Sequence, residues 1–181
     1  MVQVSVLNRL GIDEATLRGY ASVLFPDASA WDRVDFPAGA KVSYELALAL
    51  LLANHLIRFA YLDRTTALLL VQHFKGRITR HAREAEKTIE AYRRCPGSEG
   101  QMPFVCLEIL DGTWARLGDC EELFDIKRYV TAIADKALSG DTYVWSHSVA
   151  LLPLLLTACF TPEELRGHSD NREEKTADSL G

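Results

Sequence analysis

Several basic residues in the first half of the chain are suited to binding phosphate groups, namely Arg18, Arg33, Lys41, Arg58 and Arg64. Guanidinium and ammonium groups neutralise phosphate oxygens, and each such contact makes binding depend on salt concentration. A second basic group follows close behind, at Lys75, Arg77, Arg80, His81 and Arg83. The solvated face of a helix carries charges of the same kind, so the charges alone leave both interpretations open.

Charge is distributed unevenly along the 181 residues. The whole chain carries a formal charge of −5, from 20 Lys and Arg against 25 Asp and Glu. Residues 1–94 hold 13 basic and 10 acidic side chains, a formal +3, whereas residues 95–181 hold 7 and 15, a formal −8. An anionic polymer would therefore be expected to bind the first half. Because +3 is modest, we expect specific binding to require a dimer.

The nucleophilic and metal-binding residue types form no recognisable catalytic arrangement. Ser146–Ser148 places hydroxyls beside an imidazole, but neighbours on a helix point about 100° apart and cannot easily hydrogen-bond to each other. His55, His73 and His81 share no ligand spacing with a cysteine or carboxylate set. The cysteines lack a Cys-x-x-Cys pair and are expected to be reduced thiols, at Cys95, Cys106, Cys120 and Cys159. We therefore predict no enzyme activity, cofactor or metal.

The elements that would position the basic residues begin with the stretch Gly11–Tyr20. Asp13 is suited to cap a helix, since its carboxylate can accept the unpaired N–H groups of the first turn. Gly11 suits the tight turn just before it. Apolar residues recur at helical spacing on both sides of this turn, at Val4, Leu7, Leu10, Ala15, Leu17, Ala21 and Leu24. Two short helices joined by a tight turn are predicted, which is helix-turn-helix geometry.

This stretch resembles the N-terminal domain of the MerR-type transcription regulators, whose second helix carries a Thr-Leu-Arg-x-Tyr signature, here Thr16, Leu17, Arg18 and Tyr20. The resemblance continues into a predicted wing and the helix that follows it, at Trp31–Phe36, Pro37–Ala40, Lys41–Ser43 and Tyr44–Ala60. Within that wing Gly39 and Lys41 match the family, whereas Ala40 and Ser43 replace its aromatic residues. The match ends within the predicted first domain.

The resemblance implies a sequence-specific regulator that binds double-stranded DNA as a homodimer on an inverted repeat. Arg18 would contact a phosphate or base edge, with Thr16 and Tyr20 assisting at the backbone. Arg33 and Lys41 would anchor the wing at the flanking minor groove. In the alternative, the same fold is a protein-interaction module that binds no DNA, and the acidic second half binds a basic partner or another regulatory protein.

A further predicted helix has two competing roles. Residues Ile78–Arg94 repeat apolar side chains at three and four, and in the family resembled a helix at this point joins two subunits through a coiled coil. The basic residues Lys75, Arg77 and Arg80 offer the other role, a phosphate contact beside the wing. A solvated surface ranks close behind. We expect Gly76 to break the helical segment Arg64–Arg94.

Four segments are predicted: a winged helix-turn-helix domain (1–74), a linking helix (75–95), a small α+β domain (96–167) and a disordered tail (168–181). The boundary is the Pro- and Gly-rich run Pro96–Gly100. The overall class is mainly α, within α+β. In the third segment we predict two strands around a two-residue Asp111-Gly112 turn and then helices, at Phe104–Leu110, Thr113–Leu117, Glu121–Leu138 and Tyr143–Phe160, with one more helix starting at Thr161.

Two apolar runs bear on location. Leu46–Ala53 and Val149–Phe160 are both shorter than the roughly 20 apolar residues that a membrane span requires. The first is apolar almost all round, as expected for the central helix of a core. Pro153 predicts a kink or break in the second. The N-terminus lacks the pattern of a signal peptide, so we expect a cytoplasmic protein without membrane contact.

Overall fold

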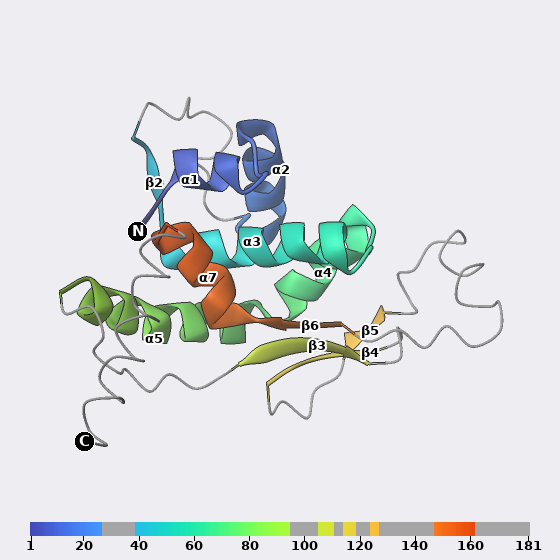
Figure 1. Cartoon of the computed structure of the whole chain (residues 1–181). Helices are drawn as coiled ribbons and strands as arrows, with labels where there is room; N and C mark the ends of the chain where they lie inside the picture. The colour runs from blue at the N-terminus through green and yellow to red at the C-terminus, as the bar shows by residue number, and fades with distance from the viewer. Residues whose placement is uncertain (27–38, 95–104, 111–113, 119–123, 127–146, 162–181) are drawn as a thin grey trace, which may run out of the picture.

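The computed structural model describes residues 1–26, 39–94, 105–110, 114–118, 124–126 and 147–161. The fold is mixed α+β, with helices and two small antiparallel sheets (Figure 1). The helices are α1 (Val4–Arg9), α2 (Glu14–Leu24), α3 (Tyr44–Phe59), α4 (Arg64–His73), α5 (Lys75–Arg94) and α7 (Leu151–Cys159). The strands are β1 (Val2–Gln3), β2 (Lys41–Val42), β3 (Cys106–Leu110), β4 (Trp114–Leu117), β5 (Phe124–Asp125) and β6 (His147–Ala150).

The predicted turn between the first two helices is present. Gly11 has a φ of 87°, a left-handed backbone conformation that would be strained for a residue with a Cβ atom. The Asp13 carboxylate accepts the Thr16 N–H at 2.7 Å and caps α2. This hydrogen bond to the charged form lowers the pKa of Asp13. The cap and the glycine together fix where α1 ends and α2 begins.

The first sheet joins the N-terminus to the end of the predicted wing. Val2 pairs with Val42 and Gln3 with Lys41, in antiparallel register. A strand is therefore present at residues 41–42, within the segment Lys41–Ser43 that we predicted as a strand. The predicted first wing strand, Trp31–Phe36, lies outside the described residues, so β1 is the strand found beside β2.

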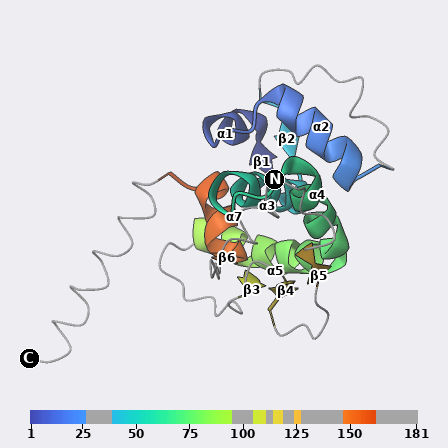
Figure 2. The ribbon, with the colours of Figure 1, turned by 90° about the vertical axis from the view of Figure 1, so that its right-hand side faces the viewer.

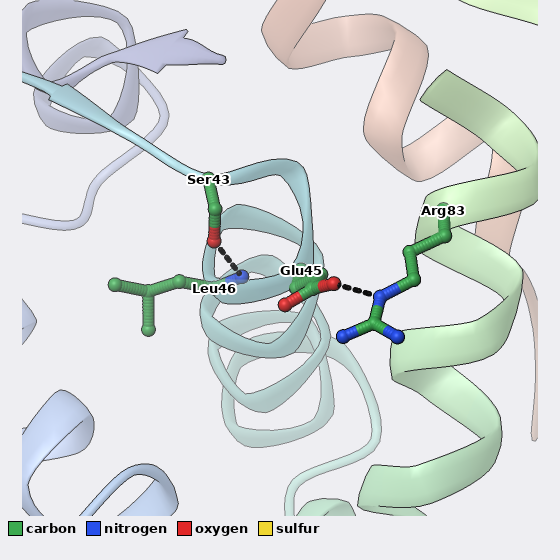
Figure 3. A network of polar contacts seen from close by, with 4 residues as sticks. All are labelled: Ser43, Glu45, Leu46 and Arg83. Carbon is green, nitrogen blue, oxygen red and sulfur yellow. Dashed lines mark hydrogen bonds and ion pairs between the residues drawn. The ribbon is translucent and has the colours of Figure 1, made fainter. Parts of the chain in front are cut away.

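Helix α3 is the centre of the molecule, as its composition predicts. Ten of its sixteen residues are buried. In both views α1 and α2 lie on one side of α3 and α5 lies on the other (Figures 1 and 2). The helix starts at Ser43, whose hydroxyl accepts the Leu46 N–H at 3.2 Å (Figure 3). A helix buried on several sides can hold the elements around it in fixed relation.

The C-terminal elements share this core. The second sheet has the order β5-β4-β3-β6, and α7 packs against both α3 and α5. Buried residues of the sheet, such as Leu107 and Ile109, belong to the same apolar cluster as those of α3. The described parts of the segments that we predicted as separate domains therefore pack around one core.

Two helix predictions in this region are partly wrong. The segment Glu121–Leu138 contains the strand β5, which pairs with β4. The segment Tyr143–Phe160 contains the strand β6, and only its later part is helical, as α7. The pattern of the short apolar run around Val149 is compatible with a strand as well as with a helix. Pairing with β3 makes it a strand. Pro153 is the third residue of α7, within the first turn, where a backbone N–H is not needed for the helix.

Two turns also differ from expectation. Leu110 pairs with Trp114, so three residues, 111–113, connect β3 and β4 instead of the predicted two; those residues lie outside the described part. The break between α4 and α5 falls at Phe74 and not at Gly76. Phe74 is 2% exposed, and burial of its ring holds the corner between the helices. None of the described helices is long and apolar enough to cross a membrane.

Candidate nucleic-acid interface

Helix α2 has one buried face and one open face. Leu17, Tyr20, Ala21 and Leu24 are buried, and α2 contacts α3 and α4. Glu14 and Ser22 are exposed on the other side, with Arg18 half-buried between them in helical spacing. The side chains that pack and those that face solvent thus separate as an amphipathic helix requires. The open face is available to a large partner.

Arg18 is held on this face by a neighbour in its own helix. Its Nη2 atom lies 3.6 Å from the Glu14 carboxylate, and both side chains remain partly exposed, at 38% and 47%. A pair four residues apart with the acid first is favourable but weak in solvent, at about 0.3–0.5 kcal/mol. Thr16, two residues earlier and on a different side of the helix, is half-buried, and its backbone N–H is used by the helix cap. The pair with Glu14 therefore contributes little to the position of Arg18.

Arg64, at the start of α4, lies over the middle of α2. Its guanidinium carbon is 5.0 Å from the centroid of the Tyr20 ring. Gly19 makes this approach possible, since a Cβ at that position would lie 2.5 Å from the Arg64 Nη2 atom. Tyr20 itself is only 7% exposed. The structure thus places the Arg64 charge, more than the predicted Tyr20 side chain, at the accessible surface of α2.

Arg58, near the end of α3, lies against the turn between α1 and α2. A Cβ at Gly11 would lie 2.6 Å from the Arg58 Nη1 atom. The Asn54 side-chain amide donates to the Leu10 carbonyl at 3.3 Å, one helical turn before Arg58. The last turns of α3 therefore hold the α1–α2 turn in place and carry a cation beside it.

The other predicted phosphate contacts near α2 are Lys75, Lys41 and Arg33. The Lys75 ammonium lies 4.3 Å from the centroid of the Phe25 ring, at the end of α2. Lys41 is exposed on β2. Arg33 lies outside the described residues. Arg18, Arg58, Arg64 and Lys75 are thus brought to the same short unit of α1, α2 and their connection.

The other basic residues of α5 lie in different environments. Arg77 and Arg80 are exposed on this helix, which lies across α3 from α1 and α2 in both views. Arg83 donates to Glu45 of α3, so it braces two helices of the core (Figure 3). His81 is 4% exposed, and neither of its ring nitrogens has a hydrogen-bond partner among the residues that the structure describes. His81 is therefore unsuited to clamp a phosphate.

The apolar side of α5 is covered by its own chain. The residues that we predicted for a coiled coil between subunits are each at most 1% exposed, at Ile78, Ala82, Ala85 and Ile89. Helix α5 contacts α3, α4 and α7. A second subunit would have to use another surface, because this face packs within the monomer.

A contact between two histidines escaped the sequence analysis. The Nε2 atoms of His55 and His147 lie 3.0 Å apart, although 92 residues separate them. Burial lowers the pKa of both, and the charge of the facing His147 lowers that of His55 further. No hydrophobic period or ligand spacing marks such a pair in a sequence. Among the residues that the structure describes, no group of three His, Cys, Asp or Glu could hold a metal ion.

Comparison of the chain with protein-family models, with curated proteins and with solved structures gives no match.

Proposed function

We propose that the chain is a sequence-specific DNA-binding transcription regulator that acts as a homodimer on an inverted-repeat operator. In this proposal α1 and α2 are a helix-turn-helix whose second helix enters the major groove. The segment that ends in β2 is the wing beside it. Its resemblance to the MerR-type regulators in the Thr16–Tyr20 signature supports the proposal.

The observation that carries this proposal is the way in which α2 is mounted. One face packs on α3 and α4, and the opposite face presents Arg18 to solvent. Arg58 and Arg64 reach over Gly11 and Gly19 to the same unit. A rigidly held helix with an open face and flanking cations is what phosphate contacts require for register and orientation.

Two of these cations depend on a glycine. At both Gly11 and Gly19 a Cβ would come closer than 3.0 Å to an arginine nitrogen. The small residues therefore allow guanidinium groups to lie close to the backbone of the turn and of α2. In the proposed complex Arg58 and Arg64 neutralise phosphates on either side of the groove that α2 enters.

We infer a homodimer for two reasons. The net charge of residues 1–94 is too small for one subunit to bind DNA tightly, and the two half-sites of an inverted repeat match the twofold symmetry of a dimer. The face of α5 centred on Ala82 and Ala85 is buried within the chain, so the subunits would meet elsewhere. A partner protein for the acidic second half remains part of the alternative, in which the helix-turn-helix fold binds protein and not DNA.

The proposal is tested with duplex DNA enriched by the protein from a random pool. The double variant Arg18→Ala with Lys41→Ala should bind this DNA at least about tenfold more weakly, with a salt dependence reduced by about two counterions. The matched control is Lys87→Ala with Arg94→Ala, which removes the same charge from exposed positions of α5. Equal binding by the two double variants would exclude Arg18 and Lys41 from the DNA interface, and failure to enrich any duplex would favour the protein-interaction module.

A further inference from the structure

The histidine pair joins two parts of the chain that are far apart in sequence. His55 lies near the end of α3, and His147 is the first residue of β6. Their Nε2 atoms are 3.0 Å apart and their ring centroids 5.2 Å. The His55 ring also packs against Phe59, at 4.8 Å between centroids. This is hydrogen-bond distance between two groups that can each donate or accept.

We propose that His55 and His147 form a proton-operated latch between α3 and β6, closed when the pair holds at most one extra proton and open when both imidazoles are charged. This inference does not depend on DNA binding. It concerns how the sheet is attached to the helical core, whatever the chain binds.

The chemistry of imidazole sets the number of protons. In the neutral pair one ring carries its hydrogen on Nε2 and donates, and the other carries it on Nδ1 and accepts. A first proton goes to the free Nδ1 of the donor ring, and one N–H···N bond remains whichever ring then holds the shared proton. A second proton places a hydrogen on both Nε2 atoms. The two cations then face each other without an acceptor and repel.

The surroundings favour release on acidification. The position opposite His147 on β3 is Ile109, which is 1% exposed, so the ring lies on the core side of the sheet. Glu108 lies on the other side of the sheet and is bonded to Arg116 of β4. Arg58 of α3 lies over Phe59 and adds positive charge nearby.

The remaining titratable groups on neighbouring elements lie at other contacts. His73 of α4 packs against Phe124 of β5, which is followed by Asp125. In α5, Arg83 is engaged with Glu45 at the opposite end of α3. Burial and the facing imidazole are the causes that lower the pKa of His55, and no described carboxylate is among them. Stability from this contact is therefore present at neutral pH and is lost as the pH falls.

The position of the histidine pair allows its protonation to affect the α1–α2 turn. Strand β6 continues directly into α7, which packs on α3 and α5. On α3, His55 is flanked by Asn54 and Arg58, the two residues that hold the α1–α2 turn. Opening the latch frees one side of the helix end that supports this turn. Acidification would thus loosen the sheet first and the α1–α2 turn next.

A double-mutant cycle in the full chain tests the latch. Phenylalanine at both positions keeps a ring and removes the hydrogen bond, so the cycle of His55→Phe and His147→Phe isolates the contact. The expected coupling is about fivefold in the folding equilibrium constant near pH 8, and none or a reversed sign near pH 5. Coupling that is equal at both pH values would overturn the proposal. The control cycle of His55→Phe with Ser148→Ala should show none, because Ser148 is exposed on the other side of β6.

Two further measurements keep the test independent of variant folding. In ¹⁵N spectra of the unaltered chain, the two rings should show opposite tautomers at neutral pH, and identical tautomers would contradict the pair. The variant His55→Gln retains an amide that can bond to His147 and removes one titrating group. Near pH 5 the β6 amides of this variant should stay protected from hydrogen exchange. In the unaltered chain their protection factors should fall by at least about tenfold at that pH. Equal loss in both proteins would show that another group controls the sheet.

Discussion

Replacing Gly19 by alanine should separate stability from DNA binding. Gly19 lies in the interior of α2, where glycine costs about 0.8–1.0 kcal/mol relative to alanine. Its new Cβ would lie 2.5 Å from the Arg64 Nη2 atom, so the guanidinium must move by about half an ångström or more. The contact of Arg64 with the Tyr20 ring contributes about 0.5–1 kcal/mol. The two effects nearly cancel, and the expected gain in unfolding free energy is between about 0 and 0.5 kcal/mol.

Urea unfolding of four proteins measures this balance: the unaltered chain, Gly19→Ala, Arg64→Ala and the double variant. In the Arg64→Ala background the glycine replacement should yield its full gain of about 0.8–1.0 kcal/mol, because nothing has to move. Binding of Gly19→Ala to the enriched duplex should weaken, with a salt slope lower by up to about 1. An equal stability change in both backgrounds would refute the close approach of Arg64 to Gly19. Unchanged DNA binding would remove Arg64 from the proposed interface.

Two other perturbations follow from single contacts. His81→Leu should raise the unfolding free energy by about 1–3 kcal/mol at neutral pH, because it removes buried nitrogens that find no partner in the described part of the chain. Burial lowers the pKa of His81 and outweighs the attraction of Glu84, so the unfolded chain binds more protons and the advantage of the variant should grow as the pH falls below about 6.5. Urea titrations at several pH values check this, and an advantage that shrinks on acidification would contradict it. Ser43→Ala should cost about 1 kcal/mol by removing the cap of α3, and Ser43→Asp should restore most of it; equal thermal stability of the two variants would show that the cap contributes little.

The local signals in the sequence predicted the turn between α1 and α2 and the central helix α3. Asp13 and Gly11 mark the turn between α1 and α2 because capping and left-handed backbone depend on the residue itself. The apolar run of α3 indicated a central helix for a similar reason, since a helix without a polar face must be surrounded.

Features that depend on distant partners could not be predicted in this way. The run around Val149 fits either period, and only its pairing with β3 makes it a strand. The prediction of an apolar face on α5 is correct. The sequence does not say whether this face packs against a second subunit or, as found, against α3 and α7. Within the candidate site, the approach of Arg58 and Arg64 to two glycines is equally long-range, as is the pairing of His55 with His147.

Selection of bound sequences from a random pool of duplex DNA is the most direct test of sequence-specific binding by this chain. The purified full chain is used at moderate salt, which suppresses non-specific attraction to phosphates. The proposed regulator should enrich an inverted repeat whose half-sites are separated by one helical turn or a multiple of it. A pool that shows no enrichment after repeated rounds, with protein that remains folded, would contradict DNA binding and favour a protein-interaction module.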